Sequence, residues 1–74
     1  MSAYGVILFH TTSAVLRAEK ILVQEGLTVK IVPTPREFST DCGIALRLDW
    51  SRTSSAQALL KSAKIEIAGI HKME

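Results

Sequence analysis

Cys42 is the only cysteine in this sequence, and its thiol is the group best suited to covalent chemistry. It lies in the polar segment Ser39–Gly43, directly before an alternating stretch typical of a β-strand. A single thiol forms neither an intramolecular disulfide nor a four-ligand zinc site, so any chemistry here is that of one thiolate. Its reactivity then depends on which elements of the chain surround it.

The composition indicates one globular domain spanning residues 1–74, because 47% of the residues are hydrophobic. No apolar run is long enough to span a bilayer, and the first residues lack the features of a signal peptide. With one cysteine and no export signal, we expect a protein of the reducing cytoplasm. We expect no metal site, no cofactor and no membrane partner.

The charge pattern argues against a nucleic-acid partner. Nine basic residues are interspersed with seven acidic ones, which gives a net charge of +2. Phosphate binding depends on clustered positive charge, with aromatic platforms where single strands are bound. The sequence shows neither, and a solvated surface of mixed charge is the better interpretation.

Hydrophobic periodicity predicts two strand–helix–strand units. Residues 4–9 form an apolar run typical of a central strand, and residues 10–13 are rich in helix-capping types. A helix is expected next, ending at Gly26 in the C′ position. Its buried stripe is predicted to contain Ala14, Val15, Ala18, Ile21 and Leu22.

The second half of the pattern begins with an alternating strand over residues 28–32. The segment Pro33–Pro35 is expected to be a loop, because proline cannot donate to a strand ladder. Residues 44–48 alternate again, and a second helix follows, with Ser51, Thr53 and Ser54 as alternative N-caps. Its predicted buried residues are Ala56, Leu59, Leu60 and Ala63. The last strand is expected over residues 65–70, and residues 71–74 carry no structural signal.

This element order predicts an α+β domain with the ferredoxin-like split βαββαβ arrangement. Right-handed crossovers give an antiparallel four-stranded sheet in the order 4-1-3-2, with two helices on one face. In that arrangement the end of the first strand, the start of the first helix and the start of the third strand meet at one edge. We therefore expect six residues to gather there: His10, Thr11, Thr12, Ser13, Arg36 and Cys42.

The start of a helix offers a way to activate a thiol, because its free N–H groups and partial positive charge stabilise an anion. Extending the alternation back from Ile44 places Cys42 on the helix-facing side of the sheet. The carboxylate of Asp41 acts against activation if its charge points inward. The alternative is that Cys42 is a small hydrophobic residue closing the core, since free cysteines are among the most buried residues.

Two motifs in this region carry a family resemblance. The chain has Pro-Thr-Pro-Arg at residues 33–36 and Ser-Thr-Asp-Cys-Gly at residues 39–43. Together they closely resemble the signature of the putative selenium/sulfur carrier protein-like family of small bacterial proteins. The opening at residues 4–9, Thr12-Ser13 and the run at residues 18–20 are also similar, so the resemblance covers about residues 4–70.

The resemblance implies that Cys42 accepts selenium or sulfur as a perselenide or persulfide and passes it on. The partners would be chalcogen donor and acceptor proteins, and the chain would be a carrier without turnover of its own. Four further residues are candidates for holding the terminal anion. Arg36 would supply charge, and the segments Thr12-Ser13 and Gly43 would supply backbone N–H groups. Alternatively, Arg36 is a solvated loop residue.

His10 is a candidate for tuning the thiol, the alternative being a capped residue at a strand end. Two other functions remain open. A non-catalytic binding or regulatory module would dimerise through the sheet, because the strand over residues 4–9 is apolar on both faces and one set would be exposed in a monomer. A single-thiol redox sensor would form an intermolecular disulfide through Cys42. No complete hydrolytic site or dinucleotide-binding loop is present.

Overall fold

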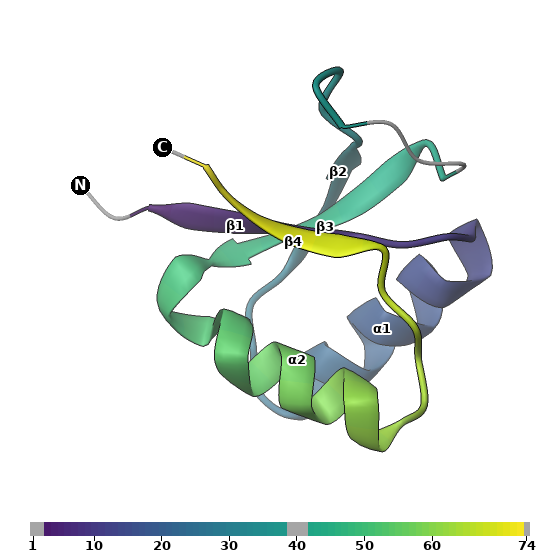
Figure 1. Ribbon diagram of the computed structural model, residues 1–74. Helices are drawn as coiled ribbons and strands as arrows, with labels where there is room; N and C mark the ends of the chain where they lie inside the picture. Colours follow the sequence, from purple (N-terminus) through teal and green to yellow (C-terminus); the bar gives the residue numbers. More distant parts are fainter. Residues whose placement is uncertain (1–2, 39–41, 74) are drawn as a thin grey trace.

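The computed structural model describes residues 3–38 and 42–73. The elements in chain order are β1 (Tyr4–Leu8), α1 (Thr12–Gln24), β2 (Lys30–Pro33), β3 (Ile44–Asp49), the short 3-10 helix η1 (Trp50–Arg52), α2 (Thr53–Ser62) and β4 (Gly69–Met73). The four strands form one sheet in the order β2-β3-β1-β4, which reads β4-β1-β3-β2 from the other edge, and each neighbouring pair is antiparallel. Both helices cover the same face of this sheet (Figure 1). The predicted α+β class, with an antiparallel four-stranded sheet and two helices, is confirmed.

Helix α1 begins and ends with the signals that the sequence carries. Thr11 is its N-cap, and the Thr11 hydroxyl accepts a hydrogen bond from the Ala14 N–H (3.1 Å). At the other end, Gly26 adopts φ +85°. The N–H of Leu27 donates to the carbonyl of Leu22, and that of Gly26 to the carbonyl of Val23. This is a Schellman motif with glycine in the left-handed position, so the predicted helix stop is confirmed.

Helix α2 ends in the same way but begins differently from our expectation. None of the three residues predicted as alternative N-caps has that role: helix α2 follows η1 directly, and no side chain caps it. The Thr53 hydroxyl instead donates back to the carbonyl of Trp50 (2.8 Å). At the C-terminal end, Lys64 takes the left-handed position with φ 60°. The N–H of Ile65 donates to the carbonyl of Leu60 in the second Schellman motif.

The main core lies between the sheet and the helices. Both predicted helical stripes contribute to it, with Val15, Ala18 and Leu22 buried from α1 and Ala56 and Leu60 from α2. The sheet contributes alternate residues, as period-2 geometry requires. From the sheet and the connecting segments, the buried members are Ile7, Phe9, Cys42, Leu46, Leu48 and Ile65.

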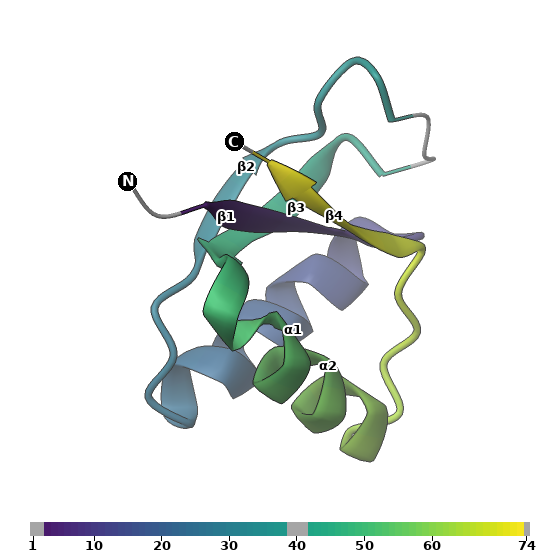
Figure 2. The ribbon, with the colours of Figure 1, turned by 60° about the vertical axis from the view of Figure 1, so that its left-hand side comes forward.

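The opposite face of the sheet is also covered, which overturns one expectation. Val6 and Leu8 are only 2% and 4% exposed, and with Ala45 they form a second buried cluster. Residues 34–38, which follow β2, rise on this side, away from the helices (Figures 1 and 2). Phe38 from that segment packs against the cluster and stacks on the His71 ring, with centroids 4.0 Å apart. The prediction that a monomer exposes one apolar set of β1 is therefore wrong.

The bounds of β2 and β4 differ most from the prediction. Pro33 belongs to β2, where it pairs with Ile44. This is allowed because β2 is an edge strand with one neighbour, so a missing N–H breaks no second ladder. The last strand is β4, residues 69–73, so His71 and the two residues after it pair with β1. Ile65 and Ile67, predicted as strand, lie before β4 and contact the main core from an irregular segment.

Candidate functional site

The thiol of Cys42 is enclosed at the end of the main core. The residue lies two positions before β3, and 3% of its surface is exposed. Its Sγ donates a hydrogen bond to the carbonyl of Ile44 (3.2 Å). Cys42 belongs to the cluster formed with the helices, so the predicted helix-facing orientation is confirmed. The same burial agrees with the alternative of a small hydrophobic residue that closes the core.

The backbone on either side of Cys42 is tied to the end of β2. The Thr34 hydroxyl donates to the carbonyl of Cys42 (2.9 Å), and the Thr34 N–H donates to the carbonyl of Gly43 (3.0 Å). Gly43 is exposed, and a Cβ atom added there would meet no atom within 4 Å. The polypeptide is thus held by two hydrogen bonds at the point where Gly43 is exposed to solvent.

The start of α1 lies beside the thiol, as the topology predicted. Thr12 Oγ1 is 4.0 Å from Cys42 Sγ, a long hydrogen bond to sulfur, although the two residues are 30 positions apart. Ser13 and His10 are exposed in the same part of the chain. Of the predicted binding residues, Thr12 is the one for which the structure gives a side-chain contact with the cysteine. The roles of Ser13, Gly43 and His10 remain predictions.

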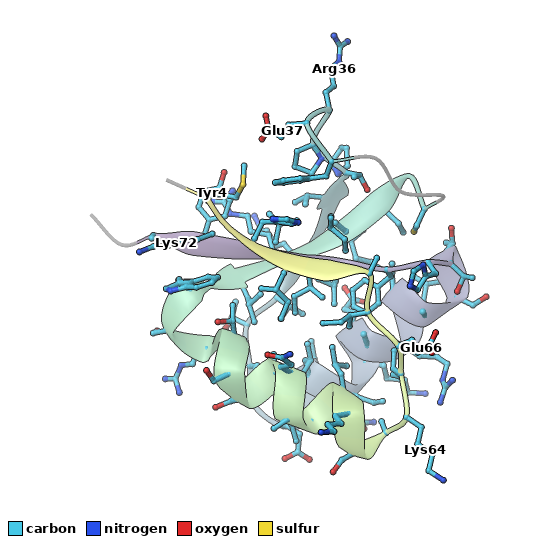
Figure 3. All side chains as sticks on the ribbon, viewed as in Figure 1. Tyr4, Arg36, Glu37, Lys64, Glu66 and Lys72 are labelled. Carbon is cyan, nitrogen blue, oxygen red and sulfur yellow. The ribbon has the colours of Figure 1, made fainter. Side chains whose placement is uncertain are left out.

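Arg36 does not lie beside Cys42, where the sequence predicted it. It is exposed, and its side chain extends from the outer end of the β2–β3 loop, away from the sheet and both helices (Figure 3). Cys42 lies on the helix side of the sheet. The structure therefore does not direct the Arg36 guanidinium toward the thiol. The carboxylate of Asp41 and the turn residues Ser39 and Thr40 lie outside the described residues.

Sequence reasoning missed three residues that organise this region: Thr34, Phe38 and His71. Thr34 was hidden inside a segment expected only to form a loop. Phe38 and His71 lie in segments with no periodicity, and their ring stack connects the β2–β3 loop to the last strand. The one available signal was Phe38, an aromatic residue in an otherwise polar loop. Such a side chain is expected to pack on an apolar surface, and the face of β1 away from the helices is apolar.

Comparison with known proteins gives one match. A family model described as "putative Se/S carrier protein-like" matches residues 4–72, which is nearly the whole chain. No curated protein and no solved structure matches the chain. In the described part of the chain, no helix is long and apolar enough to cross a membrane. Likewise, no group of three or more His, Cys, Asp or Glu side chains suited to a metal ion occurs among the described residues.

Proposed function

The chain belongs to the putative Se/S carrier protein-like family, and on that premise we propose that Cys42 carries sulfur or selenium as a persulfide or perselenide. The observation that carries the proposal is the position of this thiol. It lies between the first turn of α1 and the start of β3, beside Thr12 and directly before the exposed Gly43. The N-terminus of a helix favours a nearby anion such as the terminal atom of a persulfide.

The chemistry needs no added oxidant. The Cys42 thiolate attacks the outer sulfur of a donor persulfide, the new S–S bond forms, and the donor leaves as a thiolate with the electron pair of the broken bond. Transfer to an acceptor thiolate repeats this step in the other direction. A selenium atom follows the same route. Donor and acceptor proteins are therefore the partners that the proposal requires.

Burial adds a condition to this cycle. The added chalcogen extends the side chain by a bond of about 2 Å, and the thiol is already packed in the core. Loading removes the thiol hydrogen that Cys42 Sγ donates to the Ile44 carbonyl, and the two hydrogen bonds from Thr34 oppose any displacement of the segment around Cys42. Between transfers the same enclosure protects a sulfane sulfur from solvent thiols.

We also propose that the strand order, read from β4, is that of the ferredoxin-like arrangement.

The proposal is tested by loading the reduced protein with a glutathione trisulfide and, separately, with the analogue in which selenium replaces the central sulfur. Intact mass after treatment with glutathione should show the gain of one sulfur or one selenium atom, and cyanide should then remove the sulfur as thiocyanate. Cys42→Ser should show no gain. If the folded wild-type protein gains no atom while its unfolded form does, the carrier function is contradicted and a binding module becomes the better explanation.

A further inference from the structure

A hollow of about 290 Å³ lies at the end of the β2–β3 pair that is farthest from Cys42. The two strands pair from Pro33 and Ile44 to Lys30 and Arg47. Beyond that last pair, residues 28–29 and 48–49 line the hollow from either side. It is separated from Cys42 by the length of β3, about 20 Å at strand spacing, so it is a different site.

Two cations face this hollow, and neither has an ion pair among the residues that the structure describes. Lys30 and Arg47 are direct partners in the antiparallel pair, so their side chains leave the same face of the sheet. Like charges at directly opposed positions destabilise a sheet. In the described chain, neither side chain forms an ion pair with an acidic residue. A bound anion would remove the repulsion between the two side chains.

The Arg47 side chain is held in one orientation by an aromatic ring. Its guanidinium carbon lies 4.0 Å from the centroid of the Tyr4 ring. Tyr4 stands on the side of the sheet opposite the helices (Figure 3). A stacked guanidinium keeps its N–H groups at its edge, where two of them can donate to two oxygens of one oxyanion. The stacking thus reduces the side-chain entropy that Arg47 would lose when a ligand binds.

The remaining lining residues limit the ligand. Asp49 also lines the hollow and repels a second negative charge on its side, so the anionic group must lie toward Lys30. Thr28 adds a hydroxyl that can donate to an oxygen. The volume is just below the usual range for small-molecule sites, so the hollow suits a small ligand better than a nucleotide or another large polyanion.

We propose that this hollow binds a small molecule through one oxyanion group, a carboxylate or a tetrahedral oxyanion, held between Lys30 and Arg47. The proposal does not depend on the carrier function, because the hollow and Cys42 lie at opposite ends of β3. It assigns Arg47 the bidentate contact and Lys30 the second positive charge.

The test is a nitrogen–hydrogen correlation NMR titration of the full chain with sodium sulfate and, separately, sodium acetate, against sodium chloride at matched ionic strength. We expect saturable shifts confined to residues 28–30 and 47–49. Lys30→Gln and Arg47→Gln should each weaken binding about tenfold, the effect of losing one charged hydrogen bond. Lys61→Gln, an exposed residue at the end of α2, is the matched control and should leave the affinity unchanged.

Saturation with sulfate alone identifies a tetrahedral group as the ligand, saturation with acetate alone identifies a carboxylate, and saturation with both supports the shared oxyanion contact. Lys30→Gln leaves the Arg47–Tyr4 stack in place, so a loss of affinity in this variant is due to charge. Shifts that rise linearly with both salts, or an affinity that Lys30→Gln does not alter, overturn the proposal.

Discussion

The thiol of Cys42 should react slowly with alkylating reagents in the folded protein, because it must first be exposed. The free-energy cost of exposing it sets the factor by which alkylation is slowed. Opening the segment around the thiol breaks the two hydrogen bonds that Thr34 makes with the backbone of Cys42 and Gly43, together with the weak bond from Cys42 Sγ to the Ile44 carbonyl. The two Thr34 bonds contribute about 1–3 kcal/mol net, and burial of the thiol with its own weak bond adds about 1 kcal/mol. The opening therefore costs about 2–4 kcal/mol, and alkylation should be roughly 30- to 1,000-fold slower than in the unfolded chain.

Two variants show whether the opening is local or global. Thr34→Val keeps the side-chain shape but removes the donor to the Cys42 carbonyl, so a local opening should become about fivefold more frequent. Lys64→Gly relieves the left-handed conformation at the end of α2, outside the hydrogen-bonded segment around Cys42. This change should raise global stability by about 1 kcal/mol and leave a local opening unchanged.

The assay is intact-mass detection of alkylated Cys42 at timed intervals, in buffer and in denaturant, on reduced protein. Labelling as fast in buffer as in denaturant would refute the burial argument. If Lys64→Gly slows labelling about fivefold, the thiol is reached only by global unfolding, because a gain of about 1 kcal/mol then enters the rate in full. That result would also remove the carrier proposal, since a carrier must load without unfolding.

Three further changes test the packing. Gly26→Ala should cost about 1 kcal/mol in urea unfolding: an added Cβ meets no atom within 4 Å, so the left-handed φ alone sets the cost. An unchanged midpoint would contradict this. Gly5→Ala should cost about 1–3 kcal/mol, because its Cβ would lie 2.8 Å from Thr53 Cγ2 and 3.0 Å from Trp50 Cε3; the same melt measures it, and a neutral effect would mean that both side chains yield. Phe38→Ala should lose about 1–2 kcal/mol and increase binding of a hydrophobic dye, while unchanged dye binding would show that Phe38 does not cover the open face.

The strand and helix pattern predicted the position of Cys42 correctly because it depends on simple periodicity. Side chains alternate along a strand, and the alternation of residues 44–48 continues back across Gly43 to Cys42. The crossover geometry then places the start of α1 beside the thiol, which the contact with Thr12 confirms. Both inferences use general rules, side-chain alternation along a strand and the right-handed crossover, and this chain follows both.

The contacts across the open face could not be predicted, because they join segments without periodicity. Residues 34–38 lie on the side of the sheet away from the helices (Figure 2), and there the Phe38 ring stacks on the His71 ring. Arg36 lies in that segment and is therefore directed outward rather than toward the thiol. Ile65 and Ile67 were misassigned as strand for a related reason, since alternating apolar residues also fit an irregular segment that packs on a core.

The coverage of both sheet faces restricts where a protein partner can reach Cys42. One face is occupied by the helices, and on the other Val6 and Leu8 are already buried, so these two β1 side chains need no second copy of the chain to cover them. Access to the thiol must then come through the end of the core, where Gly43 is exposed and has open space above it. A donor or acceptor that docks there approaches the backbone of Gly43 closely, and the hydrogen bond to its carbonyl from Thr34 is the contact it would displace. Docking of the partner protein and exposure of the Cys42 thiol would thus be coupled, because the hydrogen bonds from Thr34 oppose both.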